Sequence, residues 1–264
     1  MTNPAEGYES YMVPTLFGPW ATLLLQAADP GPDDRVLDVG CGTGIVARQV
    51  ASRLGARGAV TGVDPSPDML AVARAAASRE GVAMEWLEGS AESLPFPGNS
   101  FDLVLCQFAL MFFADRAAAL AEIRRVMTGT GRLLVSVWQG LDRHPFYRTL
   151  HLAIQQRLGL SALQDIFALG DADELRALMA GAGFQRVEMA PASMTARFPN
   201  PDGFLAGEIE VDTAAIPQMQ HLDLQARQAI VAAIAADMKS ALREVTHGDH
   251  VVIPFHAHIV NARP

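Results

Sequence analysis

Between residues 35 and 138, the pattern of hydrophobic and polar positions alternates short apolar runs with longer alanine-rich stretches. A short apolar run bounded by turn residues is typical of a buried strand, and apolar residues three or four positions apart are typical of a helix. The pattern predicts strands at 35–39, 59–63, 83–87, 102–107 and 132–138, with helices near 45–54, 67–79 and 115–127. This alternation indicates βαβ units and an α/β fold with a parallel sheet covered on both faces.

The pattern changes beyond residue 140, where helices become more frequent and strands fewer. It predicts helices near 145–158 and 171–182, a strand over 184–198, a short helix that starts at Pro201, a long amphipathic helix over 222–245 and a final strand over 250–262.

Composition and charge narrow the classes of protein. Half of the 264 residues are hydrophobic, which is typical of a globular protein. The net charge of −9 argues against nucleic acid as a partner, because phosphate binding depends on Lys and Arg. The apolar runs stop well short of the roughly 20 residues that a membrane span needs. The first residues show no basic stretch followed by an apolar one, so we expect no secretion signal. Cys41 and Cys106 lack metal-type spacing, which favours a cytoplasmic protein without a metal.

The most informative segment is residues 35–44, Arg-Val-Leu-Asp-Val-Gly-Cys-Gly-Thr-Gly, directly before a helical pattern that starts at Ile45. It predicts a buried strand, a glycine turn and a helix N-terminus, with a ligand lying against the bare backbone. A dinucleotide fingerprint would need its third glycine at position 45, and no Gly-Lys-Ser/Thr of a P-loop follows. Asp38 inside the motif suits a cationic ligand better than a pyrophosphate.

This segment resembles motif I of the class I S-adenosylmethionine (SAM)-dependent methyltransferases. The phrase from Glu92 to Asp102, Glu-Ser-Leu-Pro-Phe-Pro-Gly-Asn-Ser-Phe-Asp, is similar to a signature of the branch that contains the ubiquinone/menaquinone biosynthesis C-methyltransferases. The resemblance implies a Rossmann-like, doubly wound sheet of seven mostly parallel strands, whose last strand is antiparallel, with helical cap elements. It further implies a single domain over 1–264, with N-terminal lid helices in 1–30, a SAM-binding core in 31–140, cap insertions at 141–170 and 200–248, and late strands at 184–198 and 250–262.

The resemblance also implies where each part of SAM lies. The amino acid tail is expected over the glycine loop, with Asp38 either in contact with it or holding the loop. The ribose is expected on Asp64, and the adenine after the third strand, where Ser90 replaces the family's usual acidic residue. The expected cofactor-binding residues are Asp38, Gly40, Cys41, Gly42, Gly44, Asp64, Pro65, Met69, Ser90, Ala91, Glu92, Gln107 and Phe108.

Methyl transfer from a sulfonium needs alignment more than acid–base chemistry, because positioning alone can contribute about 7–11 kcal/mol. Accordingly, no catalytic triad is visible, and the candidates for assistance are Gln107, His144, His151 and Tyr11. The two histidines could equally be surface or capping residues. Tyr8 and Tyr11 are expected either to close a lid over the cofactor or to belong to a helix that packs on the sheet.

Apolar side chains dominate the expected cap and rim, which favours a small, mainly apolar or aromatic substrate. They are Phe112, Phe113, Trp138, Phe146, Tyr147, Phe198 and Phe204. We therefore expect a SAM-dependent methyltransferase that acts on oxygen, carbon or nitrogen of such a metabolite. The alternatives are a SAM-binding protein of this fold without methyl transfer, such as a cyclase, an isomerase or a non-catalytic subunit, and an NAD-dependent oxidoreductase. The oligomeric state stays open.

Overall fold

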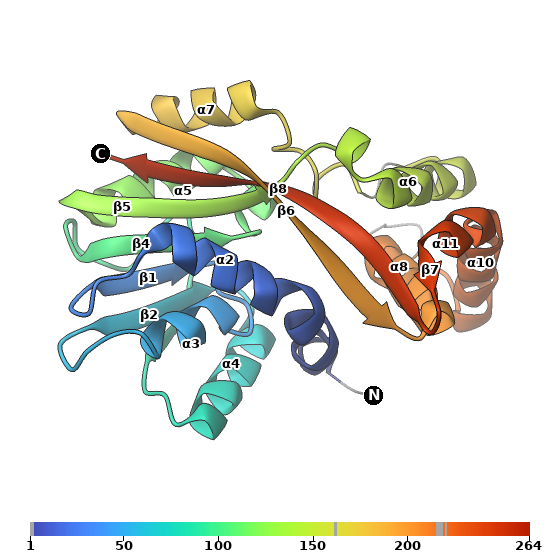
Figure 1. Ribbon diagram of the computed structural model, residues 1–264, viewed down its shortest axis with the longest axis horizontal. Helices are drawn as coiled ribbons and strands as arrows, with labels where there is room; N and C mark the ends of the chain where they lie inside the picture. The colour runs from blue at the N-terminus through green and yellow to red at the C-terminus, as the bar shows by residue number, and fades with distance from the viewer. Residues whose placement is uncertain (1–2, 161–162, 215–218, 220) are drawn as a thin grey trace. The chain divides into compact units, whose positions relative to one another are not determined.

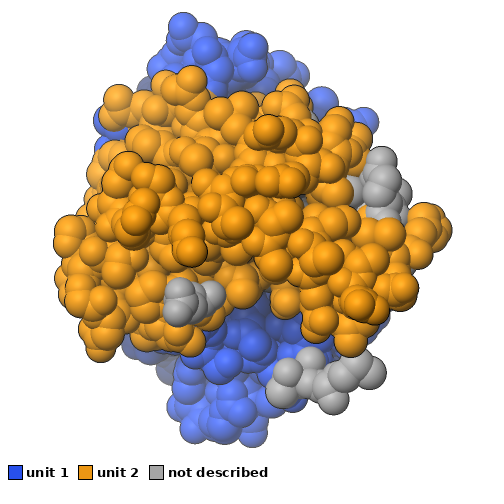
Figure 2. All heavy atoms as spheres, turned by 90° about the vertical axis from the view of Figure 1, so that its right-hand side faces the viewer, with its two compact units in different colours: residues 1–137, 171–192, 257–264 blue, residues 138–170, 193–256 orange. Residues whose placement is uncertain are grey.

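The computed structural model describes residues 3–160, 163–214, 219 and 221–264. The chain forms two compact units, coloured separately in Figure 2. Unit 1 contains residues 1–137, 171–192 and 257–264, and unit 2 contains residues 138–170 and 193–256. No helix within the described ranges is long and apolar enough to cross a membrane.

The sheet of unit 1 is built around β1 (Arg35–Val39), which is paired in parallel with β2 (Ala59–Asp64) on one side and β4 (Phe101–Gln107) on the other. The outer parallel neighbours are β3 (Glu85–Glu88) and β5 (Met127–Trp138). Leu37 and Val39 are completely buried, as expected for a central strand covered on both faces. All five predicted strands are confirmed, with β3 two residues later than its predicted start.

Helices cover both faces of this sheet (Figure 1). On one face α2 (Gly18–Ala28) packs on α3 (Ile45–Ala51), and on the other α5 (Arg116–Val126) packs on α7 (Ala172–Gly181). The sequence sets the ends of α4 (Pro67–Glu80): the Ser66 hydroxyl accepts the Met69 N–H at its start, and Gly81 adopts a left-handed conformation at its end.

The N-terminal segment is helical, with α1 (Pro4–Gly7) followed by the π-helix η1 (Tyr8–Phe17) and then α2. The wide turn has a local cause, since Pro14 lies inside it and has no N–H to donate. At its end the Gly18 N–H donates to the Val13 carbonyl, five residues back. Helices within residues 1–30 were predicted from the sequence, but this irregularity was not.

Two long late strands, β6 (Arg186–Pro199) and β8 (His250–Arg263), complete the sheet. The strand order is β3-β2-β1-β4-β5-β8-β6, and the C-terminal strands run antiparallel (Figure 1). The predicted path of seven mostly parallel strands is therefore confirmed. A two-residue strand, β7 (Thr246–His247), pairs antiparallel with β8 and was not predicted.

Unit 2 is mainly helical. Its helices are η3 (Leu141–Arg143), α6 (Pro145–Leu158), α8 (Pro201–Ala214), α10 (Leu224–Asp237) and α11 (Lys239–Val245). The prediction of one long helix over 222–245 is wrong, because the helix is interrupted at Met238, whose side chain is completely buried. Arg157 of α6 binds both carboxylate oxygens of Asp237 at 2.8 Å, just before the break.

Aromatic side chains form much of the core of unit 2. The rings of Phe198 and Phe204 lie 4.6 Å apart, and Tyr147 lies 5.4 Å from Phe255. Most of the aromatic residues that the sequence assigns to a substrate rim are thus buried against one another. Phe112 and Phe113 of unit 1 differ, since Phe112 is 62% exposed and Phe113 is half-buried. The aromatic content of the cap therefore reflects packing and does not by itself indicate an apolar substrate.

Candidate cofactor and active site

The glycine loop that follows β1 has positive φ angles at Gly40, Gly42 and Gly44 (69°, 54° and 82°), which side-chain-bearing residues resist. A Cβ on Gly40 would lie 2.5 Å from the Cβ of Ala109, and one on Gly44 would overlap the ring of Trp86. A Cβ on Gly42 would meet nothing within 4 Å. Gly40 and Gly44 thus make room for the protein's own side chains, whereas Gly42 faces open space. The expected contact of the loop backbone with a ligand stays a prediction.

Asp38 lies at the carboxyl end of β1 and is buried. Its Oδ2 accepts a hydrogen bond of 3.1 Å from the Ala47 N–H in the first turn of α3. Burial raises the pKa of Asp38 to about 7, and the nearby Asp64 carboxylate also raises it. Of the two roles expected for Asp38, the one visible in the structure is that of holding the loop between β1 and α3.

Asp64, the last residue of β2, joins the glycine loop directly. Its Oδ2 accepts from the Gly42 N–H at 2.8 Å, and its Oδ1 accepts from the Ser66 N–H at 2.9 Å. The first bond spans 22 residues and brings together two of the residues that the sequence assigns to the cofactor. The second is a local turn bond of the kind that Asp often makes.

The segment after β3 is held by hydrogen bonds of its own. The exposed Ser90 hydroxyl donates to the Glu92 carboxylate and accepts from the Glu92 N–H. The other Glu92 oxygen accepts from the Ala114 and Asp115 N–H groups. The hydrogen bond from Ser90 has the largest effect, and together these bonds hold the pKa of Glu92 below its usual range. Glu92 thereby ties the expected adenine region to the loop before α5, a role that the sequence did not indicate.

Other expected cofactor residues differ in burial. Ala91 and Cys41 are buried, Met69 is half-buried at the start of α4, and Pro65 is exposed. Burial also raises the pKa of the Cys41 thiol, so this side chain stays neutral.

Gln107, the last residue of β4, contacts the N-terminal segment. Its Nε2 donates to the Phe17 carbonyl at 3.1 Å, whereas its Oε1 is buried and has no hydrogen-bond partner among the described residues. The next residue, Phe108, has a φ of 49°, which is rare for a bulky side chain. Its buried ring lies 5.5 Å from Trp20 and 6.0 Å from Phe17. The end of β4 is therefore covered by η1 and α2.

The Tyr8 side chain interacts electrostatically with the carboxylates of Asp38 and Asp64. Its ring stacks on Phe17 at 5.1 Å. Burial raises the pKa of Tyr8, and the negative charges of Glu9, Asp64 and Asp38 raise it further. The structure thus brings Tyr8 close to the expected cofactor residues, while Tyr11 is half-buried in the same π-helix.

A buried ion-pair cluster was missed by the sequence analysis. The Arg48 side chain on α3 is 4% exposed and donates to Glu9 of η1 at 2.6 Å and to Glu80 at the end of α4. An arginine on an otherwise apolar helix face was the only available signal. The cluster fixes the N-terminal segment against the helix that follows the glycine loop.

His144 and His151 lie in unit 2. His144 is buried, with Nδ1 positioned to donate to the Gly140 carbonyl at 3.1 Å and Nε2 to accept from the His256 N–H at 3.0 Å. Burial lowers the pKa of His144 to about 4, so the ring is neutral. Both ring nitrogens bond to the backbone, so His144 is not a surface residue, and it is the N-cap residue of α6 without a side-chain capping bond. His151 is half-buried on α6.

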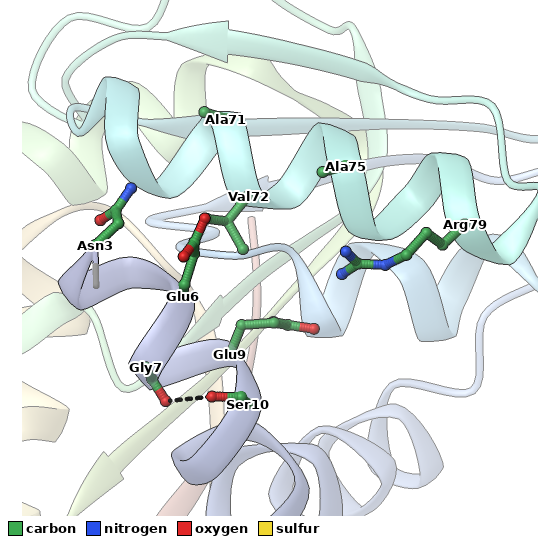
Figure 3. Close-up of a pocket in the computed structure, with 9 residues that line it drawn as sticks. All are labelled: Asn3, Glu6, Gly7, Glu9, Ser10, Ala71, Val72, Ala75 and Arg79. Atoms are coloured by element: carbon green, nitrogen blue, oxygen red, sulfur yellow. Dashed lines mark hydrogen bonds between the residues drawn. The ribbon is translucent and has the colours of Figure 1, made fainter. Parts of the chain in front are cut away.

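An open pocket of about 680 Å³ lies elsewhere in unit 1, between the N-terminal segment and α4 (Figure 3). Glu6 and Glu9 line one side, and Val72 and Arg79 line the other. None of the expected cofactor-binding residues lines this pocket, so it is distinct from the predicted cofactor site.

Comparison with known proteins identifies the class. Residues 37–135 match the model of a family described as a methyltransferase domain. The ubiquinone/menaquinone biosynthesis C-methyltransferase UbiE of Stenotrophomonas maltophilia is 32% identical over 182 residues, which cover 63% of this chain and 72% of that protein. The UbiE of Paraburkholderia phymatum is 38% identical over 128 residues, which cover 47% of this chain and 53% of that protein. The chain belongs to the class I SAM-dependent methyltransferases, and S-adenosyl-L-methionine is its cofactor.

Solved structures support the same fold. A putative methyltransferase from Bacillus halodurans is similar with a TM-score of 0.63 and 21% identity, over 92% of this chain and 97% of that chain. The [4+2]-cyclase SpnF is similar with a TM-score of 0.55 and 24% identity, over 94% of this chain and 80% of that chain.

The residues present fit the cofactor. Gly42 offers bare backbone to open space beside the Asp64 carboxylate. The Thr43 hydroxyl, between two glycines of the loop, is buried and has no hydrogen-bond partner in the described part of the chain. A polar group without a partner in such a place is typical of a ligand site.

Proposed function

We propose that this enzyme transfers a methyl group from SAM to oxygen, carbon or nitrogen of a small, mainly apolar or aromatic metabolite, and that it does so mostly by positioning. The substrate class is supported by the relatives named for ubiquinone/menaquinone biosynthesis, and not by the aromatic core of unit 2. The observation that carries this proposal is the bond between Gly42 and Asp64, which places open backbone and a carboxylate together at the carboxyl ends of β1 and β2. Ligands of open α/β sheets bind at this edge.

Each part of the cofactor has a group of matching chemistry. Asp64 accepts from the ribose hydroxyls, and the Gly42 backbone meets the amino acid tail. Ser90, Ala91 and Met69 bind the adenine. When bound, SAM supplies an electrophilic methyl group on a sulfonium. Asp38 holds the glycine loop in place, because its hydrogen bond with the Ala47 N–H joins β1 to α3.

The protein's own contribution to the reaction is alignment and exclusion of water. Gln107 ends β4 and Phe108 follows it, next to the reacting groups, and the N-terminal segment with Tyr8 covers both residues. A general base is required only if the acceptor must lose a proton, and no acid–base pair among the described residues defines one. The relatives named as C-methyltransferases support carbon as the acceptor atom.

The proposal is tested with SAM that carries a trideuterated methyl group, incubated with the enzyme and a metabolite extract. A product heavier by the labelled methyl group, together with S-adenosylhomocysteine (SAH), is the expected result, and mass spectrometry identifies the acceptor.

The second candidate is a cyclase or isomerase that binds SAM without consuming it. The likeness in fold to the cyclase SpnF supports it. A changed substrate without label and without SAH would favour this candidate and contradict methyl transfer.

A further inference from the structure

Two buried polar groups without partners lie side by side at the carboxyl ends of β4 and β5. Ser136 is 1% exposed, and its hydroxyl has no hydrogen-bond partner among the described residues. The Oε1 atom of Gln107 is likewise buried and has no hydrogen-bond partner among the described residues. Nearly all buried polar groups in proteins are hydrogen-bonded, so a neighbouring pair of unsatisfied groups calls for an explanation.

The strand register places these groups on one face of the sheet. Gln107 pairs with Ser136, which is the next pair on the same face of the sheet after Leu105 and Leu134. Partners in a parallel register point to the same face, and Gln107 reaches η1 on that face through Phe17. The two side chains are therefore the last row of the sheet beneath the N-terminal segment.

Hydrogen bonds fix what each group can do. The Phe17 carbonyl accepts only, so the Gln107 NH₂ group must face it and Oε1 remains as an acceptor. The Ser136 hydroxyl can both donate and accept. The Ser136 carbonyl accepts from the Phe108 N–H at 2.9 Å, and the left-handed φ of Phe108 turns the chain away at this point. The pair thus offers one acceptor and one donor at the edge of the sheet where ligands bind.

We propose that Gln107 and Ser136 bind a hydroxyl group of the methyl acceptor and so orient its ring. The acceptor's O–H donates to Gln107 Oε1, and the Ser136 hydroxyl donates to the acceptor's oxygen. This assignment rests on the proposed function and adds Ser136 as a specificity residue. An acceptor whose hydroxyl is blocked as a methyl ether loses the first bond and leaves Gln107 Oε1 without a partner.

Two probes of nearly equal shape test the pair: 2-naphthol, and 2-methoxynaphthalene, which lacks the O–H. Dissociation constants for both are measured by ligand-observed NMR on the full chain saturated with SAH. We expect the wild type to bind 2-naphthol at least about tenfold more tightly than the ether, which is the effect of one unsatisfied buried group. Gln107→Met, which lacks the Oε1 acceptor, should bring the two affinities within about threefold of each other. Ser136→Ala should weaken both probes by a similar factor, about threefold or more, because the oxygen of either probe can accept from the Ser136 hydroxyl.

Two further variants keep the test decisive. Leu134→Val, one row back on the same face, is the matched control and should retain the wild-type preference, and Ser136→Cys replaces Ser136→Ala if the alanine variant does not fold. A wild type that binds SAH but does not prefer 2-naphthol would overturn the assignment of Gln107 and Ser136. A preference that persists in Gln107→Met, or wild-type affinities for both probes in Ser136→Ala, would overturn it as well. Failure of the wild type to bind SAH would instead contradict the proposed function and this inference with it.

Discussion

Arg48 of α3 and Glu9 of η1 form an ion pair of 2.6 Å in which the arginine side chain is almost completely buried. The same guanidinium binds Glu80 at the end of α4. A charge taken out of water is tolerated when it is paired, and removing one partner leaves the other unsatisfied. This cluster therefore attaches the N-terminal segment to α3 and α4 of unit 1.

Replacing Arg48 by methionine should lower the free energy of unfolding by about 3 kcal/mol, at the low end of the range for breaking a buried pair, since Glu80 is half-exposed. Urea denaturation measures the loss. Arg57→Met is the matched control, because Arg57 makes an ion pair with Asp33 while 82% exposed, and such surface pairs contribute about 0–1 kcal/mol. Equal losses in the two variants would contradict the structural role of Arg48.

Asp64→Ala should weaken SAM binding by about 1–3 kcal/mol, because the ribose hydroxyls lose their acceptor and the Gly42 N–H loses its partner. Isothermal titration calorimetry gives the dissociation constant. Asp68→Ala, on the exposed first turn of α4, serves as the control and should bind SAM like the wild type. An unchanged constant for Asp64→Ala would remove Asp64 from the cofactor site.

Asp38 should make the stability of the free protein depend on pH. Its pKa is about 7 in the folded protein, mainly because of burial, and about 3.9 in an unfolded chain. The folded state therefore binds the proton more tightly, and the stability that this proton contributes is lost as the pH rises from about 4 through 7. Asp38→Asn keeps an acceptor for Ala47 but cannot ionise. Its free energy of unfolding relative to the wild type should rise between pH 5 and pH 8, as measured by urea denaturation, and a constant difference would contradict the raised pKa.

The sequence predicted the parts of the fold that local patterns encode. The strands around the glycine loop are short apolar runs, and α6 begins at Pro145 and ends before Gly159 as its residues indicate. The break at Met238 could not be predicted, because apolar residues continue through it and neither Pro nor Gly marks it. The ion pair of Arg48 with Glu9 joins residues 39 positions apart, and no spacing rule reveals such a contact.

The site was predicted to the same extent. Gly42 and Asp64 were recognised from their positions at strand ends, and the structure brings them into contact. The hydrogen bonds of Glu92 and the place of Ser136 were not predicted, since their surroundings depend on which residues of distant segments face them. Burial of Ser136 and the bonds of Glu92 to Ala114 and Asp115 exist only in the folded chain.

The three glycines of the loop should respond differently to alanine. Gly44→Ala places a methyl group inside the ring of Trp86 in addition to requiring a left-handed φ, so we expect a loss of stability of about 3 kcal/mol or more. Gly42→Ala meets no neighbour and should lose about 1–2 kcal/mol, the cost of the left-handed conformation alone. Its methyl group points into the open space assigned to the cofactor, so SAM binding should weaken in this variant much more than stability does. Urea denaturation and calorimetry on both variants measure the two effects. Tight SAM binding by Gly42→Ala would place the cofactor away from this loop, whereas equal stability losses would show that Trp86 can move aside for Gly44→Ala.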